Sequence, residues 1–228
     1  MNYKKFIENF IYTPNNGRKL LDVFKNLTLK ESELFFHEVG YQYQKYGNIA
    51  RLNKIVELGL TSSNKSVWSK AIIALANKVI ILSNTRDYNK LKSLCTSNNG
   101  MDYIKRAYTS LCYVIENTDT TYSDPGRDLL DIVIYHTKQI ESANQANLDS
   151  DFIAELFSKI VRYNCYYTNE TVSSIVDLIE FIRSYTEWVE RNMPEPLIEH
   201  KAILDLAKKA LAKLLLAAVP PLELELKI

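Results

Sequence analysis

The chain has 228 residues, of which 46% are hydrophobic and 24% charged, and its formal net charge at pH 7 is +1. This composition fits a globular protein with a real core, and the small net charge gives no support for a strongly basic nucleic-acid-binding protein. Glycine and proline each occur six times. Strand-rich folds and phosphate-cradling loops need more glycine, so the sequence favours long helices joined by short polar loops.

Apolar residues recur at helical spacing from one end of the chain to the other. The clearest stripe runs from Ile104 to Ile115 at the spacing i, i+3, i+4, i+7, i+8, i+11. Segment 65–83 is apolar around most of its circumference, so we place it at the centre of the stack. The expected helices span residues 2–12, 17–27, 30–46, 48–59, 65–83, 87–96, 101–116, 126–141, 150–164, 170–191 and 197–218.

Several of these helices have recognisable start and stop signals. Thr28 and Glu31 form a capping box, in which each side chain satisfies an unpaired amide of the other residue. Asp124 before Pro125 predicts an N-cap followed by proline at the first helical position. The pair 99–100, Asn-Gly, ends one helix or turn before the next helix starts.

Residues 33–60 carry a more specific pattern. Phe36, Val39, Gly40, Tyr43, Gly47, Leu52 and Val56 have the spacing of a tetratricopeptide-type helix pair. This segment resembles one such repeat. The resemblance implies that the small residue at 40 lets two helices approach closely and that the glycine at 47 ends the first helix. Leu52 stands where alanine is usual, no proline closes the unit, and the match covers only about an eighth of the chain.

Later helix pairs depart from that pattern. Segments 101–141 and 150–191 have units of roughly forty residues, closer to HEAT-type or armadillo-type lengths. We therefore predict an all-α fold of stacked antiparallel helix pairs, a degenerate TPR-like or HEAT-like helical repeat or right-handed α-solenoid, with a short C-terminal β-strand. An ordinary helical bundle without repeats would show similar periodicity.

The composition changes after Asn192, which predicts a helical-repeat domain at 1–192 and a distinct segment at 193–228. No Ser, Thr, Asn, Gln or Gly follows Asn192. The segment is either a natural cap on the last repeat or a separately derived or engineered appendage.

The last residues, LELELKI, alternate with the period of a half-buried strand. Leu222, Leu224, Leu226 and Ile228 share one face of this strand. We expect the strand either to add to a sheet in another chain, or to pair with its symmetry mate in a homo-oligomer. The alternative is a tail lying along the helices.

Cysteine and histidine give no sign of catalytic or metal chemistry. Cys95, Cys112 and Cys165 are far apart and form no CxxC pair, and Cys112 reads as a small buried hydrophobe. His136 lies on an apolar stripe and reads as a core histidine, and no histidine has a metal-ligand spacing. Nucleotide-binding and nucleophile motifs are also missing. We expect no enzymatic activity, no cofactor and no metal.

We expect neither a secretory signal nor a membrane-spanning segment in this sequence. The first ten residues lack the apolar core of a secretory signal. The apolar runs 71–82 and 211–219 are interrupted by polar residues, among them Asn77 and Lys78, and neither is expected to cross a bilayer. We expect a cytoplasmic protein without membrane association.

Tyrosine is abundant and gives the best candidate interaction residues. Aromatic side chains beside cations suit protein interfaces and single-stranded nucleic acid, although plain packing explains them as well. The candidates on the two tyrosine-rich segments are Tyr41, Tyr43, Tyr46, Tyr163, Tyr166 and Tyr167.

These patterns predict a non-enzymatic scaffold or adaptor that binds another protein or a peptide. The alternatives are a small helical subunit of a nucleic-acid-binding complex, and a structural or engineered chain whose tail drives self-assembly. Phosphate contacts would make affinity fall steeply with salt, whereas a tyrosine-lined protein groove should respond weakly.

Overall fold

The computed structural model describes residues 2–13, 17–97 and 99–118 continuously, and beyond them a set of single positions. The chain divides into two compact units, Met1–Tyr122 and Ser123–Ile228. The single positions belong to the second unit, and each of them is helical and lies inside a helix that the periodicity predicts. They are residues 128, 129, 131, 132, 135, 136, 152, 155, 183, 187, 191, 205, 208, 209 and 212.

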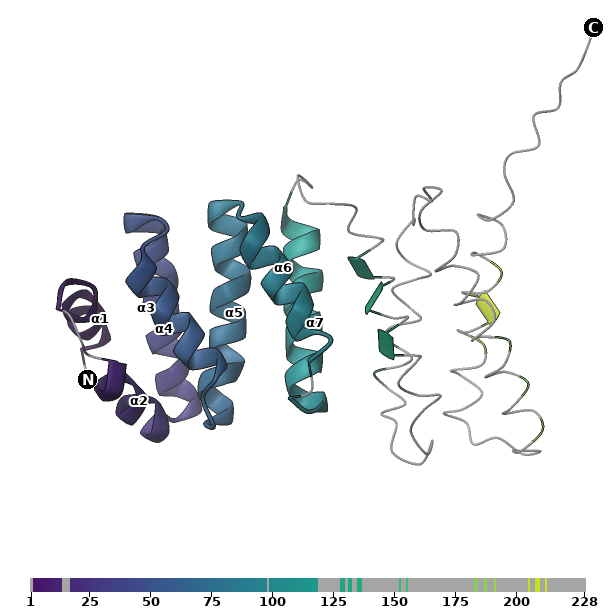
Figure 1. Ribbon diagram of the computed structural model, residues 1–228, viewed down its shortest axis with the longest axis horizontal. Coiled ribbons are helices and arrows are strands. Elements are labelled where there is room, and N and C mark those ends of the chain that lie inside the picture. The colour runs from purple at the N-terminus through teal and green to yellow at the C-terminus, as the bar shows by residue number, and fades with distance from the viewer. Residues whose placement is uncertain are drawn as a thin grey trace, which may run out of the picture. The chain divides into compact units, whose positions relative to one another are not determined.

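The continuously described part of the first unit contains seven helices and no strand, which confirms the all-α prediction for this part of the chain (Figure 1). The boundary expected at 192–193 and the expected terminal strand lie outside the described residues. The helices are α1 (Tyr3–Tyr12), α2 (Gly17–Asn26), α3 (Leu29–Tyr46), α4 (Ala50–Leu60), α5 (Lys65–Leu82), α6 (Thr85–Leu94) and α7 (Met101–Asn117).

The helix ends follow local chemistry. The capping box is confirmed, because the Thr28 amide donates to Glu31 Oε2 at 2.9 Å and the Glu31 amide donates to Thr28 Oγ1 at 3.3 Å. Gly47 ends α3 with φ +68°, as expected of this glycine. Helix α6 starts two residues before its expected position because Asn84 caps it, accepting hydrogen bonds from the amides of Arg86 and Asp87.

The expected N-cap at Asp124 and Pro125 lies outside the described residues.

Among the residues that the structure describes, no helix is both long enough and apolar enough to cross a membrane.

Phe35 joins the first three helices. Its ring lies within 5.3–6.2 Å of four other aromatic rings, measured between centroids, and three of these contacts are edge-to-face. Such arrangements are favourable beyond the area they bury. The four partners are Tyr3 and Phe6 of α1, Phe24 of α2 and Phe36 of α3.

Helix α5 is the centre of the packing. It contacts α3, α4, α6 and α7, so that one helix pair covers it on each side (Figure 1). This agrees with the prediction made from its apolar circumference. Asn64 anchors its start, because the Asn64 amide nitrogen donates to the carbonyls of Phe24 and Leu27 at 2.8 and 2.9 Å.

The close approach of helices occurs at Gly59 and not at Gly40, where the tetratricopeptide-type pattern places it. A Cβ atom on Gly59 would lie 2.7 Å from both Ala71 Cβ and Phe36 Cζ, whereas a Cβ on Gly40 would meet nothing within 4 Å. The expectation for Gly40 is therefore wrong. Gly59 lets α4 lie against α3 and α5 at a distance that excludes even a methyl group.

These two glycines form a matched pair for a stability test. We expect Gly59→Ala to lower the free energy of unfolding by about 1–2 kcal/mol, because overpacking outweighs the gain in helix propensity. Gly40→Ala should raise it by about 0.5–1 kcal/mol, since alanine is the better helix former and has room there. Hydrogen exchange of the α5 backbone amides, measured on the full chain, reports the change in the free energy of unfolding of the first unit for each substitution. Equal effects of the two substitutions would contradict this packing.

Candidate interaction site

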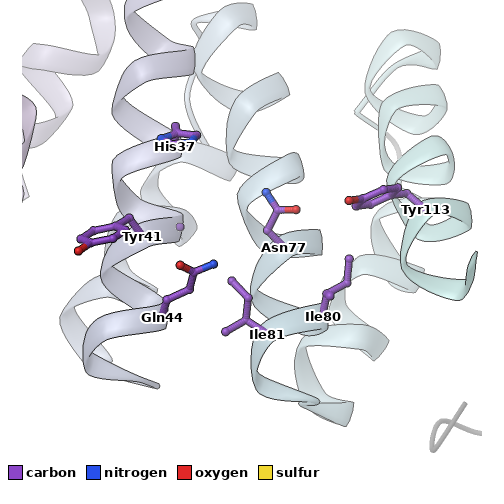
Figure 2. Close-up of a pocket in the computed structure, with 8 residues that line it drawn as sticks. His37, Tyr41, Gln44, Asn77, Ile80, Ile81 and Tyr113 are labelled. Carbon is purple, nitrogen blue, oxygen red and sulfur yellow. The ribbon is translucent and has the colours of Figure 1, made fainter. Parts of the chain in front are cut away.

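A hollow of about 300 Å³ crosses three helices of the first unit. We call it the groove. Alternate helices form its walls and floor: α3 on one side, α5 in the middle and α7 on the other (Figure 2). The lining residues are His37, Gly40, Tyr41 and Gln44 of α3, Asn77, Ile80 and Ile81 of α5, and Tyr113 of α7.

The helical repeat explains how these residues come together. His37, Tyr41 and Gln44 are spaced i, i+4, i+7, and Asn77, Ile80 and Ile81 are spaced i, i+3, i+4, so each set shares one face of its helix. Figure 2 shows Gln44 and Tyr113 directed toward α5 from the two sides. Tyr41 and Tyr113 stand at the edges with exposed fractions of 51% and 49%.

The lining contains no Asp, Glu, Lys or Arg. It offers amides, an imidazole, two phenols and two isoleucines. Phosphate binding depends on lysine and arginine, so this lining does not suit a nucleic-acid backbone. It does suit an uncharged ligand with both apolar and hydrogen-bonding groups.

The three tyrosines predicted on α3 do not lie together. Tyr41 borders the groove. Tyr43 is fully buried and donates from its hydroxyl to Asn53 Oδ1 at 3.0 Å. Tyr46 lies near the end of the helix, with Lys45 Nζ 4.5 Å from its ring centroid. The other predicted interaction residues, Tyr163, Tyr166, Tyr167, Leu222, Leu224, Leu226 and Ile228, lie outside the described residues.

A second, polar pocket of about 150 Å³ is lined by residues of α4, α5 and α6 and by Asn48 and Asn84, which lie outside these helices. Two of its lining residues, Lys78 and Asp87, form an ion pair with a 2.5 Å separation, and their side chains are only 4% and 13% exposed. The Lys78 ammonium also lies 5.4 Å from the centroid of the Tyr43 ring.

Several polar groups of this pocket are paired with one another. Asn53, which accepts from Tyr43, donates its own amide to Asn48 Oδ1 at 2.8 Å. Burial raises the pKa of Tyr43, and the nearby negative charges of Asp87 and Glu57 raise it further, so the phenol stays a neutral donor. We interpret the polar pocket as a structural network that ties α3 and α4 to α5 and α6.

The described thiols and His136 have structural surroundings. Cys95 and Cys112 are buried thiols outside any disulfide, and burial raises the pKa of Cys95 so that its thiol stays protonated. His136 is 8% exposed and makes an edge-to-face contact with the Phe152 ring. Among the described residues, no three His, Cys, Asp or Glu side chains are placed to hold a metal ion.

Sequence reasoning missed most of the groove. It noted Asn77 only as an interruption of an apolar run, and it did not select Gln44, Ile80, Ile81 or Tyr113. A polar residue in the middle of the most apolar helix is a usable signal. The neighbouring Lys78 gives the same signal, however, and only the structure shows that the two residues face different surroundings.

The ion pair of the polar pocket should contribute strongly to stability. We expect Asp87→Asn to lower the free energy of unfolding by about 3 kcal/mol, because it leaves the buried ammonium without a counter-charge. Lys78→Met should be similarly destabilising, and the double variant should lose much less than the sum of the two. Hydrogen exchange of the α5 backbone amides, measured on the full chain, reports the loss of stability in each variant. A loss in the double variant equal to the sum of the two single losses would contradict the coupling.

The chain was compared with protein-family models, with curated proteins and with solved structures, and none of them matches it.

Proposed function

We propose that this protein is a non-enzymatic interaction scaffold that holds a segment of a partner protein in the groove. The observation that supports this most is the uncharged lining of the groove, with the side chain of Asn77 open to it from the middle of an apolar helix. Isoleucines give the groove an apolar floor, and amide and phenol groups give it hydrogen-bonding capacity.

The placement of the groove supports the same proposal. Its walls come from α3, α5 and α7, which are alternate helices of the packed pairs. In stacked helix-pair proteins, one helix of each pair contributes to a common surface, and that surface binds the partner. We therefore propose that the chain is a degenerate helical repeat and that the groove is part of its binding surface.

The two tyrosines suit a protein partner. Each is about half exposed, 51% for Tyr41 and 49% for Tyr113, so each has surface left to bury. Tyrosine offers a large contact area with few rotatable bonds, which lowers the entropy lost on binding. The groove lining contains no lysine or arginine, and aromatic rings among cations are the arrangement that favours stacked nucleic-acid bases. Lys45, one turn after Tyr41 on α3, interacts electrostatically with Tyr41 but lies outside the lining.

The test compares a groove variant with a matched surface variant. We expect the double variant Tyr41→Ala, Tyr113→Ala to lose partner binding by about tenfold or more, because two half-exposed aromatic anchors are removed. Tyr12→Ala is the control, since Tyr12 is 67% exposed and lies outside the groove. Affinity capture from host extract with the full chain, quantified by mass spectrometry, compares the three proteins.

An oligonucleotide shift assay at low and high salt accompanies this capture. We expect no shift at either salt concentration, since phosphate contacts would give a strong salt dependence. Partner recovery that is unchanged in the double variant would contradict the proposed site. A salt-sensitive shift would favour the nucleic-acid alternative.

A further inference from the structure

Asn77 is not explained by the folding of α5. Asparagine is a poor residue for a helix interior because its side chain competes for backbone hydrogen bonds. Residue 77 lies between the buried residues Ala76 and Lys78 in a helix that is otherwise mostly apolar. Lys78 has Asp87 as its ionic partner. The amides of Asn77 and Gln44, in contrast, have no hydrogen-bond partner within the part of the chain that the structure describes.

A free carboxamide in a groove selects for a particular ligand chemistry. It presents one acceptor oxygen and two donor hydrogens side by side, which is the complement of the N–H and C=O of a peptide group. Backbone groups inside a helix are already paired with one another. An extended segment leaves them free, so it can pair with Asn77 where a helix cannot.

The rest of the groove fits such a segment. Ile80 and Ile81 provide an apolar floor beside Asn77, and Gln44 and Tyr113 are directed toward α5 from either side (Figure 2). Packed helices lie about 8–10 Å apart, so a ligand that crosses from α3 over α5 to α7 spans roughly 16–20 Å. At about 3.3 Å per residue this corresponds to five or six extended residues.

We infer that the groove binds an extended, uncharged polypeptide segment of about five or six residues. The side chain of Asn77 forms hydrogen bonds with one peptide group of this segment, and an aliphatic or aromatic side chain of the segment packs on Ile80 and Ile81. This inference rests on the proposed function and specifies its partner. Because no Asp, Glu, Lys or Arg lines the groove, the central residues of the segment are neutral, and binding depends little on salt.

The test uses a phage-displayed library of random twelve-residue peptides, selected on the full chain. We expect selected peptides to share a short uncharged stretch with one large apolar residue and without the i, i+3, i+4 apolar spacing of a helix. Methylation of successive backbone nitrogens in a selected synthetic peptide should lower affinity at least tenfold at one position.

A double-mutant cycle tests whether Asn77 forms the hydrogen bond with the peptide backbone of the ligand. We expect Asn77→Leu to weaken the unmethylated peptide about tenfold and to abolish the sensitivity to methylation at that position. Asn89→Leu is the matched control. Asn89 is an exposed asparagine on α6 outside the groove, and its substitution should leave both affinities unchanged. The α5 amide exchange verifies that both variants are folded.

The outcomes separate this inference from the proposed function. Selected peptides with helical apolar spacing, or a methylation scan without a sensitive position, would overturn the extended-backbone inference. The groove would then remain a protein-binding site if Tyr41→Ala, Tyr113→Ala still abolished binding. If no selected peptide depended on Tyr41 and Tyr113, both proposals would fail.

Discussion

The structure of the first unit depends on the burial of α5. A helix that is apolar around most of its circumference has no face to leave in water, so neighbours must cover it on several sides. Helices α3, α4, α6 and α7 do this. The approach at Gly59 sets how closely α3, α4 and α5 pack, because a side chain there would collide with Ala71 and Phe36. The groove and the polar pocket lie along α5 where its cover is incomplete.

Two consecutive polar residues of α5 illustrate how position on the helix decides the role of a side chain. Successive residues of an α-helix point about 100° apart. Lys78 therefore lies against α6, where Asp87 neutralises it, and Asn77 faces the groove between α3 and α7. A charged group at the position of Asn77 would face a lining without counter-charges. A neutral amide is tolerated there because water or a ligand can satisfy it.

The sequence predicted the helices well because periodicity and capping are local properties. The capping box at Thr28 and the end of α3 at Gly47 are examples. Prediction from the sequence failed where the outcome depends on which face of a helix contacts a neighbouring helix, as for Gly40. The tyrosines of α3 were partly predictable: residues two apart do not share a helix face, so Tyr41 and Tyr43 could not both line one surface. The groove could not be found from sequence because three helices distant along the chain contribute to it.

The position of the groove on α5 has a consequence for recognition. Its floor belongs to α5, which is covered by α3, α4, α6 and α7 and is held at Asn64 and at the Lys78–Asp87 pair. Side chains on such a platform lose little freedom when a ligand binds, so less of the interaction free energy is consumed in ordering them. A groove without charges gains no long-range attraction. In the binding mode that we propose, specificity comes from the fit of an apolar side chain and from hydrogen bonds, which become strong only when the ligand excludes water from the side-chain amide of Asn77.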